Sequence, residues 1–131
     1  GGESKVTGVI RYGRRVSVPG LNLFEAPGHD LVSITGQAAA GCTLILFTTG
    51  RGTPGGFAAP VLRVTTNSDI YNRKKGWNDF DAGKLLGGTP MEILTEDLLR
   101  LVLKVANGEV KTNTEVNRYF EMGIWRDGIT T

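Results

Sequence analysis

Short apolar runs separated by glycine and proline predict a chain of alternating strands and helices. A continuous apolar run, Thr43–Phe47, is typical of a central parallel strand covered by helices on both faces. The pieces Val6–Ile10 and Val16–Val18 flank a turn at Gly13 and predict an edge hairpin. Two further strands are expected at residues 21–25 and at Pro60–Thr66.

Three segments carry the helical signals. The first has Asp30 placed as an N-cap and Gly41 as a C-cap, and the second is a short helix with Asn67 as its cap. The third and longest has Thr89 as its cap, with Pro90 in its first turn. Its buried stripe is expected to be Leu94, Leu98, Leu101, Val102 and Val105.

This alternation predicts a single α/β domain over residues 1–131, with a mostly parallel sheet and right-handed crossovers. Residues 1–19 are expected to form an N-terminal edge segment, and residues 109–131 a C-terminal tail that packs on the domain. Within that tail, Ile124 and Trp125 fit either a last short strand or a docking segment.

Composition and charge exclude several classes of protein. The 15 Lys and Arg residues nearly balance the 13 Asp and Glu residues, which does not suit a nucleic-acid-binding domain. No apolar run is long enough for a membrane span, so we expect a soluble, cytoplasmic chain. With a single cysteine, Cys42, and a single histidine, His29, the chain cannot assemble a zinc-type cluster by itself.

The most informative segment is the loop TTGRGTPGG, which begins at Thr48 and follows the predicted central strand. Ligands of parallel α/β sheets bind beyond the carboxyl ends of the strands, where this loop is placed. Backbone N–H groups in a glycine-rich turn bind anions, and hydroxyl and guanidinium groups add donors. The candidate binding residues are Thr48, Thr49, Gly50, Arg51, Gly52 and Thr53. The alternative is a structural turn, because the loop has neither the P-loop nor the dinucleotide-binding pattern.

Other polar residues have both a functional and a structural interpretation. Asn67 either binds ligand at the next strand end or only caps its helix. Asp79 and Asp81 either share one side of an extended segment, as a metal site requires, or cap a short helix that begins near Ala82. Asp81 is the candidate metal ligand because it lies next to the Ala82–Gly83 turn.

His29 and Cys42 are not assigned a chemical role from the sequence. His29 stands at a helix start with no carboxylate partner that the sequence identifies, so a solvated or capping group is favoured over a general base. Cys42 precedes an apolar strand and is expected to be a small buried residue.

The chain resembles a known family over nearly its whole length. The stretch PGHDLVSITGQAAAGCTLILFTTGRGTPGGFAAPVLRVTTNSDIY, followed by NDFDAG, KVANGE and IWRDGIT, is similar to the C-terminal part of the altronate and galactarate dehydratases, which are sugar-acid hydro-lyases. The resemblance implies a Rossmann-like three-layer domain cut from a longer chain. The family pattern places an asparagine where this chain has Asp81. This difference argues against Asp81 as a metal ligand.

The resemblance also implies an activity and its partners. The expected reaction is dehydration of altronate or galactarate to a 2-keto-3-deoxy acid, assisted by a divalent metal, expected to be Fe²⁺. Arg51 would bind the substrate carboxylate and stabilise the charge of the enediolate. The expected partners are the sugar acid, the preceding domains of the same chain and further copies of it, with no nucleic acid and no membrane.

Two alternatives to this activity stay open. One is a fragment of the large subunit of a sulfolactate sulfo-lyase, which belongs to the same superfamily and eliminates sulfite in place of water. The other is a non-catalytic module for anion binding or assembly, because no full catalytic set is visible in the sequence.

Overall fold

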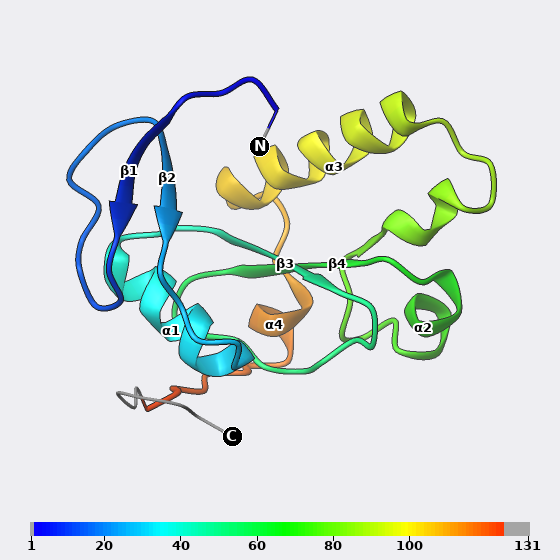
Figure 1. Ribbon diagram of the computed structural model, residues 1–131. Coiled ribbons are helices and arrows are strands. Elements are labelled where there is room, and N and C mark those ends of the chain that lie inside the picture. The colour runs from blue at the N-terminus through cyan, green and yellow to red at the C-terminus, as the bar shows by residue number, and fades with distance from the viewer. Residues whose placement is uncertain (1, 125–131) are drawn as a thin grey trace.

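The computed structural model describes residues 2–124. It shows a mixed α/β domain with two parallel sheets (Figure 1). The larger sheet has the order β3-β4-β5, with all neighbouring strands parallel. The smaller sheet pairs β1 with β2, also in parallel. The strands are β1 (Val6–Ile10), β2 (Leu21–Phe24), β3 (Ile45–Thr49), β4 (Val61–Thr65) and β5 (Phe80–Asp81).

Helices cover both faces of the larger sheet. Figure 1 shows α3 on one face and α1 and α4 on the other. The helical elements are α1 (Asp30–Ala40), α2 (Ser68–Arg73), the 3-10 helix η1 (Ala82–Leu85), α3 (Met91–Ala106) and α4 (Asn113–Val116). The predicted three-layer architecture and parallel sheet are therefore confirmed.

The core consists of two apolar clusters separated by β4. Val61 packs with Ile34 of α1 on one face, and Leu62 and Val64 pack with Val105 of α3 on the other. Alternate residues of a strand point to opposite faces, so one short strand supplies both clusters. All five residues of β4 are buried, and this strand is the centre of the sheet.

The structure corrects two predictions about strands. β3 lies at the edge of the larger sheet, so the central strand is β4; Leu46 of β3 is 47% exposed. No strand forms at Val16–Val18, and β1 pairs in parallel with β2 in place of an antiparallel hairpin. The N–H of Val16 instead donates to the carbonyl of Ala40, which ties the crossover between β1 and β2 to the end of α1.

The helix starts also differ from the predictions by one residue. Helix α1 begins at Asp30 and has His29 in the N-cap position, and α3 has Pro90 in place of Thr89 at its N-cap. Neither N-cap residue makes a side-chain hydrogen bond to the helix. The predicted end of α1 is confirmed, because Gly41 takes the left-handed conformation that ends the helix, with φ 108°.

The C-terminal tail contains a helix that the sequence analysis missed. α4 begins with a reciprocal capping box between Thr112 and Glu115. Thr114 Oγ1 donates to the carbonyl of Val61 at 3.1 Å, and the N–H of Gly123 donates to Thr35 Oγ1 at 3.0 Å. The tail thus contacts both β4 and α1. Ile124 is exposed and outside any strand, and Trp125 lies outside the described residues.

Candidate functional site

Three segments of the predicted site meet at one edge of the larger sheet. β3, β4 and β5 are parallel and end at Thr49, Thr65 and Asp81, so their carboxyl ends share that edge. The glycine-rich loop follows Thr49, and Asn67 follows β4. The loop therefore lies where ligands of parallel α/β sheets bind.

The glycine-rich loop is stabilised by its own hydrogen bonds. Thr49 Oγ1 accepts the N–H of Arg51 at 3.3 Å and that of Gly52 at 3.0 Å. Two of the amides that were expected to face an anion are thus bonded within the loop. Gly52 has φ 66°, which other residues rarely adopt, and Thr48, Gly50 and the Arg51 side chain are exposed.

A lysine that the sequence analysis did not select fixes this loop from outside. Lys74 Nζ, from the end of α2, donates to the carbonyl of Arg51 at 2.9 Å and to that of Gly52 at 3.1 Å. The ammonium also lies 4.8 Å from the centre of the Trp77 ring. Two cationic groups, Arg51 and Lys74, therefore belong to the same end of the domain.

Lys74→Met should loosen the loop without unfolding the domain. It removes two charge-assisted hydrogen bonds, worth roughly 1.5–3 kcal/mol each when formed in full, but leaves the buried clusters intact. We expect hydrogen exchange at the amides of Arg51 and Gly52 to accelerate about tenfold or more. The exposed Lys75→Met is the matched control, and equal exchange in both variants would contradict the role of Lys74.

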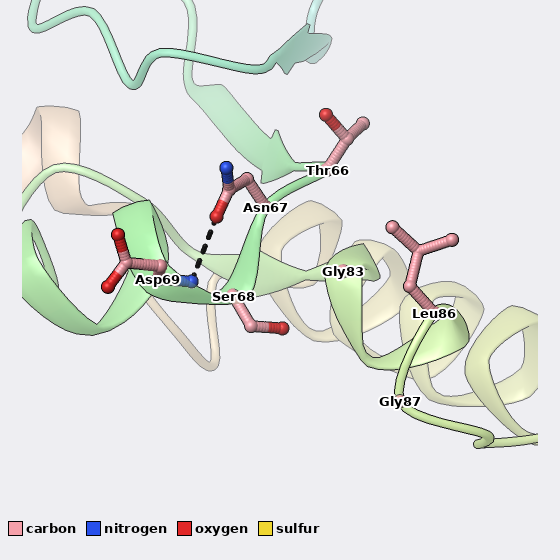
Figure 2. A pocket seen from close by; sticks show the side chains of 7 residues that line it. All are labelled: Thr66, Asn67, Ser68, Asp69, Gly83, Leu86 and Gly87. Carbon is pink, nitrogen blue, oxygen red and sulfur yellow. Dashed lines mark hydrogen bonds between the residues drawn. The ribbon is translucent and has the colours of Figure 1, made fainter.

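Asn67 is the N-cap of α2. Its Oδ1 accepts the N–H of Asp69 at 2.9 Å, drawn as a dashed line in Figure 2, and that of Ile70 at 3.2 Å. The capping alternative is confirmed, and a contact with ligand stays a prediction. A cavity of about 410 Å³ opens beside this cap (Figure 2). It is lined by Thr66, Asn67, Ser68, Asp69, Gly83, Leu86 and Gly87.

Asp81 caps the 3-10 helix η1. Its Oδ1 accepts the hydroxyl of Ser68 and the N–H of Gly83, both at 2.9 Å, and the residue is buried. The capping alternative is thus confirmed. Within residues 2–124, no group of three or more His, Cys, Asp or Glu side chains is placed to hold a metal ion. Metal binding by Asp81 stays a prediction.

Asp79 joins the central strand to the C-terminal tail. Its Oδ2 accepts the N–H of Arg63 in β4, and its Oδ1 accepts the N–H of Asn113 in α4, both at 2.7 Å. Burial raises the pKa of this carboxyl group, and the two backbone hydrogen bonds and the Arg63 charge oppose that rise. The role of Asp79 is therefore structural, because both of its oxygens accept hydrogen bonds from the backbone and connect β4 to α4.

A second cavity, of about 330 Å³, lies between the start of α1, the glycine-rich loop and β4. It is lined by Gly28, His29, Asp30, Leu31, Ile34, Thr53, Pro54 and Arg63. Of the predicted loop residues only Thr53 lines it, whereas Asn67 lines the first cavity and Arg51 lines neither. The structure thus divides the predicted site between two cavities that share no lining residue.

Arg63 is the functional candidate that the sequence analysis missed. It stands in the middle of β4, and its side chain is 1% exposed. Burial lowers the pKa of its guanidinium, which the nearby carboxylates of Asp79, Asp30 and Glu121 oppose. Because arginine is almost never fully buried without a partner, an arginine inside the apolar stretch PVLRV was the available signal.

Residues 1–130 match the family described as D-galactarate/Altronate dehydratase, C-terminal. The chain belongs to this family. It is 45% identical over 129 residues to the altronate dehydratase of Escherichia coli, and 41% identical over 130 residues to that of Bacillus subtilis. It is 37% identical over 113 residues to the galactarate dehydratase (L-threo-forming) of Escherichia coli.

These matches confirm the family resemblance. They cover 98%, 98% and 85% of the chain but 26%, 26% and 22% of the three relatives, so the chain spans about a quarter of their length. The chain therefore corresponds to the C-terminal domain that the family description names. Within residues 2–124, no helix is both long and apolar enough to span a membrane.

Proposed function

We propose that the whole protein containing this domain is a hydro-lyase that dehydrates a sugar acid of the altronate or galactarate type. The product would be a 2-keto-3-deoxy acid. The observation that supports this proposal most strongly is the 45% identity to an altronate dehydratase across 98% of the chain. The domain would supply the carboxyl edge of its sheet, with the glycine-rich loop, as one wall of the active site.

The chemistry of such a dehydration explains the cationic end of the domain. Loss of the proton at C2, next to the carboxylate, forms an enediolate that carries a second negative charge. The C3 hydroxyl leaves, the two together give water, and the enol tautomerises to the keto acid. Arg51 would bind the substrate carboxylate, with Thr48, Thr49 and Thr53 as candidate partners of its oxygens.

The described residues do not fit the divalent metal that the family resemblance implies. Asp79 uses both oxygens for backbone N–H groups, and Asp81 Oδ1 already accepts two hydrogen bonds. We therefore assign the ligands of Fe²⁺ or another divalent ion, and the catalytic base, to the part of the protein outside this chain. A cytoplasmic location and a homo-oligomer are also proposals for the whole protein.

The proposal is tested by assaying the whole protein against altronate, galactarate, other aldonates and aldarates, and sulfolactate, with Fe²⁺, Mn²⁺ or Mg²⁺. We expect formation of a keto acid from at least one sugar acid, and no turnover by residues 1–131 alone. Release of sulfite from sulfolactate, with no sugar acid consumed, would replace the hydro-lyase by a sulfo-lyase. No turnover of any of these acids would contradict a lyase activity altogether.

Arg51→Lys should lower kcat/KM of the whole protein even though the charge is kept. A guanidinium binds a carboxylate through two parallel hydrogen bonds, whereas an ammonium is a point charge. We expect a loss of about tenfold, as for one charge-assisted hydrogen bond of roughly 1.5 kcal/mol. Arg73→Lys, an exposed change in a surface ion pair with Asp69, serves as the control. Unchanged kinetics in Arg51→Lys would remove Arg51 from the site.

A further inference from the structure

Arg63 has buried hydrogen-bond donors without partners. Its Nη2 donates to the carbonyl of Gly55, and its guanidinium stacks 4.9 Å from the centre of the Phe47 ring. Its Nε and Nη1 are buried and make no hydrogen bond with any of the residues 2–124. An unsatisfied buried donor costs roughly 1–3 kcal/mol, and more when it is charged. Such an arrangement is expected where a ligand completes the hydrogen bonds.

Arg63 is one of the residues that line the second cavity, so its unpaired donors lie next to a space of ligand size. The cavity lies at the N-terminus of α1, a helix of 11 residues whose N-cap, His29, makes no side-chain hydrogen bond to the first turn. The positive end of the helix dipole and the free N–H groups of the first turn favour an anion there. Thr53 of the glycine-rich loop adds a hydroxyl group to the lining. Its volume, about 330 Å³, is within the range of small-molecule sites, roughly 300–1,000 Å³.

The charges around Arg63 indicate which anion the cavity suits. Asp79, Asp30 and Glu121 act on the guanidinium electrostatically, but none of them forms an ion pair with it in the described part of the chain. No carboxylate of the described residues therefore neutralises the guanidinium by direct contact. Asp30 also lines the cavity, where its carboxylate repels a second full charge but accepts hydrogen bonds from hydroxyl groups. A carboxylate flanked by hydroxyl groups fits better than a phosphate or sulfate.

We propose that this cavity binds the substrate of the whole protein, a polyhydroxy carboxylate, with Arg63 Nε and Nη1 donating to its carboxylate and Asp30 accepting from its hydroxyl groups. The substrate class rests on the hydro-lyase function proposed above. Arg63 then donates to the carboxylate from inside the domain, whereas Arg51, which is exposed and does not line this cavity, would approach the same acid from the solvent side.

Arg63→Met in the whole protein separates a binding role from a structural one. Methionine keeps an apolar stem of similar length and removes the unpaired donors, but it also removes the hydrogen-bond partner of the Gly55 carbonyl, so a modest fall in the unfolding temperature is expected. The KM for the sugar acid should rise about 10- to 100-fold, the loss expected for charge-assisted hydrogen bonds. Arg63→Lys, which keeps the charge but not the paired donors, should show an intermediate rise in KM. Arg100→Met, on the exposed face of α3, is the matched control and should change neither quantity.

Thermal unfolding with added ligands gives an independent readout. The sugar acid should raise the unfolding temperature of the native protein and not that of Arg63→Met. The alditol of the same carbon skeleton, which lacks the carboxylate, and inorganic sulfate, which lacks the hydroxyl groups, should have little effect on either.

Three outcomes would overturn the inference, and they can be told apart. If the native protein turns over a sugar acid and Arg63→Met has an unchanged KM, only the Arg63 site fails. If the native protein turns over no sugar acid, the proposed function fails and the substrate class assigned to this cavity fails with it. If both Arg63 variants lose stability and the acid does not stabilise the native protein, Arg63 pairs with a carboxylate of the protein itself.

Discussion

Replacing Asp79 by asparagine should detach the C-terminal tail from the central strand. Both oxygens of Asp79 accept a backbone N–H at 2.7 Å, one from Arg63 and one from Asn113. In asparagine one of these acceptors becomes an NH₂ group, which cannot accept a hydrogen bond and faces another donor. The change also removes the largest of the charges that oppose the lowered pKa of Arg63.

We expect the free energy of opening of β4 and α4 to fall by about 3 kcal/mol, the upper part of the usual range for a lost buried acceptor. Hydrogen exchange of the whole protein, followed in peptides that cover 61–65 and 112–116, should then accelerate about a hundredfold. Asp97→Asn, on the exposed side of α3, is the matched control. Unchanged protection in Asp79→Asn would show that these two hydrogen bonds contribute little to stability.

Gly83→Ala should be nearly as damaging, because there is no room for a side chain at this position. A Cβ at Gly83 would lie 2.4 Å from the backbone nitrogen of Ser68 and 2.8 Å from its hydroxyl oxygen. That hydroxyl donates to the same Asp81 oxygen that accepts the N–H of Gly83. The change must therefore separate η1 from the start of α2, at a cost of about 1–3 kcal/mol.

The same glycine-to-alanine change at Gly76 provides the comparison. A Cβ there would meet no atom within 4 Å, so Gly76→Ala should leave the domain unchanged or slightly more stable. The measurement is hydrogen exchange in peptides covering 66–70 and 81–86 of the whole protein. Equal protection in the two variants would mean that the backbone near Ser68 moves aside without a measurable loss of stability.

Much of the fold could be predicted from the sequence because local signals and burial agree. The period of Leu94, Leu98 and Val105 identified α3 and its buried face, and Gly41 marked the end of α1. Alternating strands and helices also gave the parallel sheet. The order of the strands was not predicted correctly, because the apolar run at 43–47 does not reveal whether its strand lies at the centre or at the edge of the sheet.

The sequence predicted the position of the candidate site better than the contacts within it. The glycine-rich loop lies at the carboxyl edge as expected, but the roles of Lys74 and Arg63 depend on contacts across 22 and 8 positions in the sequence. No local pattern reports such contacts. α4 had a readable signal, the TNTE capping box, and its short length concealed it among polar residues.

The contacts of the tail also determine the order in which this domain can fold. Thr114 reaches Val61 across 53 residues, and Gly123 reaches Thr35 across 88. Contacts between such distant positions carry a large loop-closure entropy and form slowly. Gly55 and Gly56, which contact Arg63 and the tail, are therefore expected to become fixed only in the last folding steps. The cavity beside the start of α1 would then take its final shape only after the tail has reached β4 and α1.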